Sequence, residues 1–272
     1  MPTEAWRRVS VSDAVLEVTD RGSGEPLVLI QTALIADELL PLADDPGLRD
    51  HFRVIAHHRR GYGRSSPVAG AGSIERDADD CRELLAGLGV GRAHVVGLSY
   101  SGAVALQLAR SAPDLVHSLC LIEPPPLHTP SAGEFVAANA ELTDLYRRNG
   151  VPAALDRFGD FIGADWRRVL ERRLPGAGAR AERDAGTFFA TDLPALLSWR
   201  FGPDDARRIG QPVLHVGGTE SGPWFAEVRE LVLAWLPHAE DVVLDGADHS
   251  LALTHTSELG EALASFLRRH PM

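Results

Sequence analysis

The feature that most constrains the fold is a regular alternation of short apolar runs with amphipathic segments. Four apolar runs lie at residues 26–30, 53–56, 93–96 and 118–122. Helical patterns separate them, at residues 37–51, 73–88 and 100–111. Two shorter strand patterns, at 6–11 and 14–18, come first. Short, almost continuous apolar strands that alternate with helices are typical of a parallel sheet covered on both faces.

This alternation stops at the three consecutive prolines 124–126. Residues 131–200 are helical in pattern, rich in charge and alanine, and contain no strand candidate. Strands then resume at 212–216 and 241–244, with helices at 225–236 and 256–269. We therefore predict an α/β fold with a mostly parallel eight-stranded sheet. Its core comprises residues 1–130 and 201–272, and residues 131–200 form a helical insertion after the sixth strand. Ligands of open α/β sheets bind beyond the carboxyl ends of the strands, so the insertion is expected to act as a lid.

Composition excludes several classes of function. The 272 residues carry a formal net charge of −11, which argues against nucleic acid or an anionic membrane as the main partner. The N-terminus has no signal-peptide pattern and no eighteen apolar residues run together, so a cytoplasmic protein is expected. The two cysteines, Cys81 and Cys120, lie in core-like patterns, which makes a disulfide framework or a cysteine metal site improbable. We expect no metal and no cofactor, and the sequence does not indicate an oligomeric state.

A candidate nucleophile lies where the fifth predicted strand passes directly into a helix, at residues 94–102. The turn centred on Ser99 is tight, so the positions two before and two after it must be small. Gly97 and Ser101 meet that condition. The turn lifts the Ser99 hydroxyl above the sheet edge and places the N–H of Tyr100 at a helix N-terminus, where an oxyanion is favoured. An alternative interpretation is a tight structural or phosphate-binding turn.

A serine hydroxyl needs a neighbouring base, and of eleven histidines only His249 lies in the segment 245–250, which comes just after the last strand and before the last helix. A carboxylate must orient the imidazole. Glu220, after the strand at 212–216, is the first choice, and Glu123, after the strand at 118–122, is the alternative. The chain order of serine, acid and histidine fits both equally. The alternative roles are an exposed loop acid for Glu220 and a buried structural acid for Glu123.

At this point the chain resembles the α/β-hydrolase fold superfamily. The resemblance covers the turn at 97–102, the loop at 60–65, the segment around His249, and the strand at 26–30 with its following loop. It implies a serine-nucleophile enzyme without a cofactor, whose second oxyanion N–H comes from Ala33. These motifs are specific for the fold and only weakly specific for the substrate.

Two departures from the family pattern stand out. Gln31-Thr32 replaces the usual His-Gly after the third strand, so Thr32 adds bulk beside Ala33. His58 stands where the family usually has an aspartate; we interpret the run of residues 57–60 as a structural, partly solvated turn without ligand spacing for a metal. Other residues that could line a substrate pocket are Gln31, Thr32, His128, Trp199 and Trp224, with core packing as the alternative for both tryptophans.

The sequence thus predicts a serine hydrolase that cleaves an ester, lactone or thioester of a small organic molecule through an acyl-enzyme at Ser99. Serine at the nucleophile position argues against the epoxide and haloalkane branches, which resemble this family but use aspartate. Two alternatives stay open. One is a non-hydrolytic enzyme on the same fold (an acyltransferase, a C–C bond hydrolase or a natural-product tailoring enzyme), which the Gln31-Thr32 departure favours. The other is a ligand-binding receptor.

Overall fold

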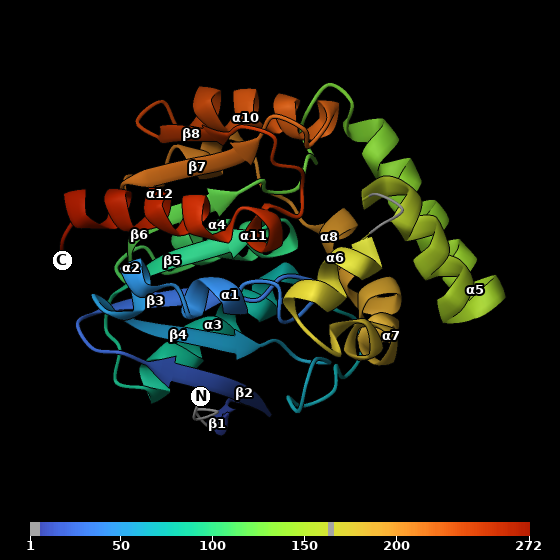
Figure 1. The fold of residues 1–272 in the computed structure, drawn as a ribbon, viewed down its shortest axis with the longest axis horizontal. Helices are drawn as coiled ribbons and strands as arrows, with labels where there is room; N and C mark the ends of the chain where they lie inside the picture. The colour runs from blue at the N-terminus through green and yellow to red at the C-terminus, as the bar shows by residue number, and fades with distance from the viewer. Residues whose placement is uncertain (1–5, 163–165) are drawn as a thin grey trace.

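A computed structural model describes residues 6–162 and 166–272, and its centre is one eight-stranded sheet (Figure 1). The order across the sheet is β1-β2-β4-β3-β5-β6-β7-β8. The strands are β1 (Arg7–Val11), β2 (Ala14–Arg21), β3 (Glu25–Ile30), β4 (Phe52–His58), β5 (Ala93–Leu98), β6 (Val116–Ile122), β7 (Val213–Gly218) and β8 (Glu240–Leu244). Only the pairs β1–β2 and β2–β4 are antiparallel. The predicted mostly parallel α/β sheet is confirmed.

The strand order decides where a site can form. β5, β6, β7 and β8 are consecutive parallel neighbours. The segments that follow their carboxyl ends therefore meet at one edge of the sheet, although they are far apart in the sequence.

Helices cover both faces of the sheet, which is why the inner strands β3, β4, β5, β6 and β7 are mostly buried. One face packs against α3 (Ile74–Gly87), α4 (Tyr100–Ser111), α9 (Pro203–Ala206) and α10 (Pro223–Trp235). The other packs against α1 (Leu40–Ala43), α2 (Pro46–Arg49), α11 (Leu251–Thr254) and α12 (Thr256–Arg269). Cys81 and Cys120 are buried free thiols in these two layers.

The single helix expected over residues 37–51 is wrong, because the structure has the two short helices α1 and α2 there. Proline lacks the N–H that a continuing helix needs, and Pro46 occupies the first turn of α2. Asp45 caps α2 by accepting a hydrogen bond from the Gly47 N–H at 2.9 Å. The chain therefore restarts a helix instead of extending one.

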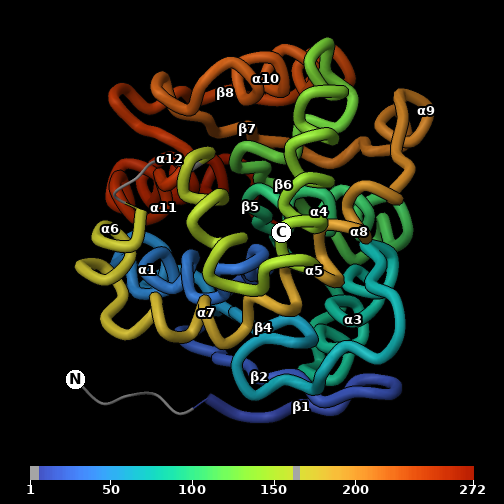
Figure 2. Tube along the Cα trace, turned by 90° about the vertical axis from the view of Figure 1, so that its right-hand side faces the viewer, coloured from blue at the N-terminus to red at the C-terminus, as the bar shows by residue number. Residues whose placement is uncertain are grey.

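The described part of the insertion between β6 and β7 contains helices and turns and no strand. It comprises α5 (Ala132–Ile162), α6 (Trp166–Arg173), α7 (Ala177–Thr187), the π-helical turn η1 (Phe188–Asp192) and α8 (Leu193–Ser198). A helical insertion after the sixth strand is thus confirmed. Figure 2 views the molecule from the side toward which the parallel strands point. In this view α5 and α8 lie in front of β5, β6 and α4. No helix within the described residues is both long enough and apolar enough to cross a bilayer.

Candidate active site

Ser99 lies in the turn between β5 and α4 with a strained backbone. Its φ of 51° and ψ of −119° fall outside the regions that residues with a side chain normally adopt. Its N–H donates to the Ile122 carbonyl at 3.0 Å, which ties the turn to the neighbouring strand β6. Strain of this kind persists only where the surroundings enforce it, and it is frequent at functional sites.

The residues beside Ser99 show why the turn needs small side chains. A Cβ atom on Gly97 would lie 2.3 Å from the Ser101 carbonyl oxygen, so only glycine fits there. Ser101 stands where the family usually has glycine, and its side chain is accommodated by hydrogen bonds within the turn. Its hydroxyl donates to the Leu98 carbonyl at 3.0 Å and accepts from the Leu98 N–H at 2.9 Å. This serine therefore braces the turn.

His249 contacts a carboxylate that follows β6. Its Nδ1 lies 2.6 Å from Oε2 of Glu123, and Oε1 of Glu123 accepts the Gly218 N–H at 2.8 Å. The Phe225 ring stacks on the imidazole with 4.0 Å between ring centroids and 17° between planes. Glu123 also has a positive φ, of 43°. The imidazole is thus fixed on one side by a carboxylate and on one face by an aromatic ring.

Glu123 is ionised in this setting. Burial opposes its ionisation, but the hydrogen bond and the attraction of His249 and the Gly218 N–H outweigh burial, so the pKa of Glu123 lies below its usual value. A buried carboxylate beside Nδ1 favours the tautomer that keeps the proton there and leaves Nε2 free to act as a base.

The sequence ranked Glu220 above Glu123, and the geometry favours the reverse order. Glu220 is exposed, and its N–H donates to the Ala247 carbonyl at 2.8 Å. Among the described residues, Glu220 makes no hydrogen bond or ion pair with His249, whereas Glu123 makes both. Chain order alone was unable to separate the two carboxylates, because both follow strands at the same sheet edge.

Ser99 and His249 line the same cavity of about 650 Å³. Residues of the core line it together with side chains of α5, η1 and α8, most of which are apolar. Ala33 and Tyr100, the two predicted oxyanion donors, also line it. Tyr100 is the first residue of α4, where a helix leaves its N–H groups without intrahelical partners.

Of the five residues proposed for a substrate pocket, Thr32 and Trp224 line this cavity. The other three are not among the residues described as lining it. The Gln31 side chain is fully buried, with no hydrogen-bond partner among the described residues. His128 is exposed and packs on Trp235. Trp199 belongs to the core and donates its indole N–H to Gln107 at 3.1 Å, so the packing alternative holds for it.

The prediction of a partly solvated turn at residues 57–60 is wrong, since all four side chains are buried. Arg59 lies between the carboxylates of Asp77 on α3 and Asp192 on η1, each at 2.6 Å. The Tyr62 hydroxyl donates to Asp192 at 2.6 Å and accepts the Leu34 N–H at 3.0 Å. Leu34 directly follows Ala33, so this buried network links the lid to the predicted oxyanion loop.

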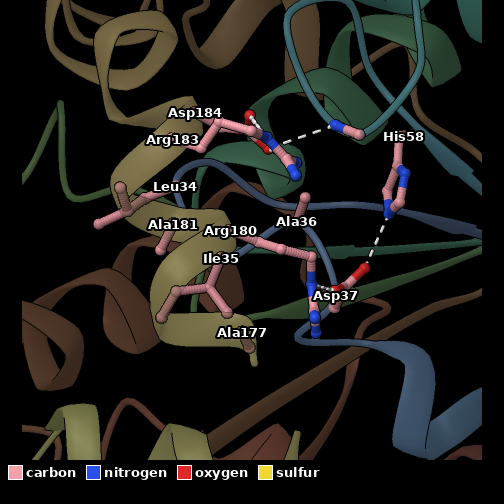
Figure 3. A pocket seen from close by; sticks show the side chains of 11 residues that line it. Leu34, Ile35, Ala36, Asp37, His58, Ala177, Arg180, Ala181, Arg183 and Asp184 are labelled. Carbon is pink, nitrogen blue, oxygen red and sulfur yellow. Dashed lines mark hydrogen bonds and ion pairs between the residues drawn. The ribbon is translucent and has the colours of Figure 1, made fainter. Parts of the chain in front are cut away.

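A second contact between lid and core surrounds His58 (Figure 3). Its Nε2 lies 2.8 Å from Asp37, and Asp37 also accepts from Arg180 of α7 at 2.6 Å. On the other side, Nδ1 lies 3.0 Å from Glu17. Burial opposes protonation of His58, but the hydrogen bonds to these two carboxylates outweigh burial and raise its pKa. His58 therefore joins Asp37 and Glu17 in one buried cluster, at the position where the family usually has an aspartate.

Reasoning from sequence missed two elements of the site. Glu38, which lines the cavity, belongs to a segment that we interpreted as an amphipathic helix. Asp192 lies in the lid, more than a hundred residues from its partners. The only available signal was Arg59 itself, a second arginine next to the family's arginine, which demands a carboxylate if it is buried.

Comparison with known proteins identifies the family that has this architecture. Residues 29–256 match the family model described as alpha/beta hydrolase fold. The chain belongs to the α/β hydrolase fold family. It is similar to the putative carbamate hydrolase RutD of Agrobacterium fabrum, at 29% identity over 259 residues that cover 92% of this chain and 97% of the relative.

Solved structures of α/β-hydrolases have the same fold. A thermophilic esterase from Thermogutta terrifontis superimposes with a TM-score of 0.82 at 22% identity, covering 97% of this chain and all of the esterase. The enol-lactonase from Burkholderia xenovorans LB400 gives 0.80 at 22% identity, covering 96% of this chain and all of the lactonase. At these identities the structures support the fold and leave the substrate open.

Proposed function

We propose that this α/β-hydrolase is a serine hydrolase that cleaves an ester, lactone or thioester through an acyl-enzyme at Ser99. The observation that carries the proposal is the 2.6 Å contact between His249 Nδ1 and Glu123 at the cavity that the strained Ser99 also lines. The relatives named above are a putative carbamate hydrolase, an esterase and an enol-lactonase, which supports a hydrolytic reaction.

In the proposed mechanism, Ser99 attacks the substrate carbonyl while Nε2 of His249 takes the hydroxyl proton. Glu123 stabilises the imidazolium that forms. The N–H groups of Ala33 and Tyr100 stabilise the oxyanion of the tetrahedral intermediate. His249 then protonates the leaving group, and a water molecule, deprotonated by His249 in turn, releases the acid from Ser99.

Labelling with a fluorophosphonate tests this proposal directly. We expect the wild-type protein to be labelled at Ser99, and Ser99→Ala to lose both labelling and hydrolysis of p-nitrophenyl esters while its circular dichroism is unchanged. A folded wild-type protein that reacts with neither probe would overturn the proposal and favour a ligand-binding receptor. Adding alcohol, amine or thiol acceptors separates hydrolysis from acyl transfer by the identity of the product.

A further inference from the structure

The described part of the cavity wall is negatively charged. Four carboxylates line it, and His249 is the only basic side chain among the described lining residues; the carboxylates are those of Glu38, Asp160, Glu220 and Asp248. In a partly enclosed cavity with apolar walls, charges of one sign attract the opposite sign and repel their own. The cavity is therefore unfavourable for an anionic substrate.

Glu38 differs from the other three carboxylates. Asp160 pairs with Arg157 at 3.2 Å, Asp248 accepts the Ser250 N–H at 2.9 Å, and Glu220 is exposed to water. Glu38 is only 8% exposed, and within the described residues its side chain has no hydrogen bond or ion pair. Burial without a partner is costly for a carboxylate.

The charged groups around Glu38 do not stabilise its ionised form enough to offset burial. Burial raises its pKa to about 7; His249 opposes this rise, and Asp248 and Glu123 add to it. His249 is committed to Glu123 through the 2.6 Å contact. A cation brought by a ligand would restore the ionised form of Glu38.

The rest of the cavity wall suits an organic cation whose charge is surrounded by alkyl groups. Aromatic faces attract organic cations such as quaternary ammonium groups. Six aromatic side chains besides Tyr100 line the cavity: Phe135, Phe158, Phe161, Phe188, Trp224 and Phe225. Phe135 packs edge-on against Trp224 at 5.4 Å, and Phe161 lies 6.3 Å from the same ring.

We propose that Glu38 is a substrate-recognition residue, and that the cavity takes acyl substrates that carry a positively charged amine while disfavouring anionic ones. This inference rests on the proposed hydrolase function and names its substrate class. Glu38 contacts the ammonium group, and the aromatic rings enclose its alkyl substituents. No step of the chemistry at Ser99 passes through Glu38.

The test uses ester pairs that differ only in charge. On the acyl side, p-nitrophenyl 4-(trimethylammonio)butyrate is compared with its carbon isostere, p-nitrophenyl 5,5-dimethylhexanoate, and with the anionic p-nitrophenyl hemiglutarate. On the alcohol side, 2-(trimethylammonio)ethyl butyrate is compared with 3,3-dimethylbutyl butyrate. At pH 8 and low salt we expect kcat/KM to favour the cation over its isostere by about tenfold in at least one pair, and the anion to react slowest.

Glu38→Gln keeps the shape of the side chain and removes its charge. We expect this variant to lose most of the preference for the cation, measured as the ratio of kcat/KM for the cation to kcat/KM for its neutral isostere, so that a general change in activity cancels. Glu134→Gln, an exposed change at the start of α5 outside the cavity wall, lowers the net negative charge equally and should retain the preference.

Two results would overturn the inference: equal kcat/KM within both isosteric pairs, or the same preference in Glu38→Gln as in the wild type. If Glu38→Gln is too slow to assay, inhibition of fluorophosphonate labelling by tetramethylammonium decides, because protection must weaken in the variant. A failure of the proposed function gives a different result, since the neutral esters and the fluorophosphonate would then not react at all.

Discussion

At the scale of single residues, the carboxylate facing His249 makes the sharpest prediction. Glu123 is buried, hydrogen-bonded to Nδ1 and ionised, so Glu123→Gln removes the charge that stabilises the imidazolium. Replacing a triad acid by its amide costs about 10⁴-fold in kcat where it has been studied, and a fall of about 10³–10⁴-fold is expected here. Initial rates with a neutral p-nitrophenyl ester measure it.

Glu220→Gln is the matched comparison, because Glu220 was the acid that the sequence favoured. Its side chain is exposed and has no contact with His249 among the described residues. The fall in kcat should therefore be far smaller than in Glu123→Gln. If the two variants lost activity in the reverse order, the assignment of Glu123 as the acid would be wrong.

Glu38 makes a second residue-scale prediction, on stability. Its pKa in the folded protein is about 7, above the value of about 4.5 in the unfolded chain. Below pH 4.5 both states hold the proton and Glu38 is neutral in both. As the pH rises to 7, the unfolded state ionises first, so the folded state loses relative stability, and above 7 the loss is complete. Glu38→Gln should therefore be no more stable than the wild type at pH 4 and more stable by up to about 3 kcal/mol at pH 8.

Urea unfolding of the two proteins at both pH values measures this difference. The groups that act on Glu38 are His249, Asp248 and Glu123, and all three are unchanged in the variant. A stability difference that stayed constant between pH 4 and 8 would contradict a raised pKa for Glu38.

The sequence singled out individual residues only where a local pattern and a position in the fold coincide. Ser99 is marked by a strand that runs directly into a helix between small residues, and the structure places it in a strained turn there. His249 is marked by its place between the last strand and the last helix. The choice between Glu123 and Glu220 depends on which loop turns toward the imidazole, which no local pattern encodes. Glu38 escaped notice because its burial arises from the fold of the whole segment.

At the scale of elements, the loop after β3 is held by a hydroxyl from the loop after β4. Tyr62 accepts the Leu34 N–H and donates to Asp192. Tyr62→Phe leaves both groups buried without this partner, which costs about 1–3 kcal/mol of stability. Since Leu34 adjoins Ala33, the proposed oxyanion donor, we expect kcat to fall by about tenfold with little change in KM.

The separation of kcat from KM distinguishes this positioning role from general destabilisation. Tyr146→Phe is the matched control, because it removes a hydroxyl from a tyrosine on α5 that is outside the described cavity wall. Equal kcat values for Tyr62→Phe and the wild type, at a temperature where both are folded, would show that Tyr62 does not position the loop.

Elements with strong periodicity were predicted almost to the residue. The helices expected at 100–111 and at about 256–269 have the bounds of α4 and α12. The single helix expected at residues 37–51 was wrong because the apolar pattern continues across Pro46, where the backbone cannot. The π-helical turn η1 has no sequence signature of its own. It presents Asp192 to Arg59, and this tertiary contact is not encoded in the local pattern.

At the scale of the whole molecule, a buried ion pair and a partly exposed ion pair join the lid to the core. Their burial determines how much each contributes to stability. Arg59 and Asp192 form an ion pair with side chains 2% and 3% exposed. Arg180 and Asp37 form another, with the Arg180 side chain 39% exposed. Solvent screens an exposed pair, which contributes at most about 1 kcal/mol, whereas breaking a buried pair costs about 3–5 kcal/mol.

The two contacts therefore predict different effects of removing one lid partner. Asp192→Asn leaves Arg59 buried with Asp77 as its remaining carboxylate, so we expect about 3 kcal/mol of destabilisation. Hydrogen exchange should also speed up in α7, η1 and α8. Arg180→Ala removes an ion pair that solvent already screens, so it should lower the free energy of unfolding by less than about 1 kcal/mol. Hydrogen exchange should change only slightly, and only in α7. Unfolding and exchange of both variants at one pH compare them directly. Similar losses of stability in the two variants would mean that the burial of an ion pair does not determine how much it contributes. The lid would then be held to the core mainly by its apolar packing.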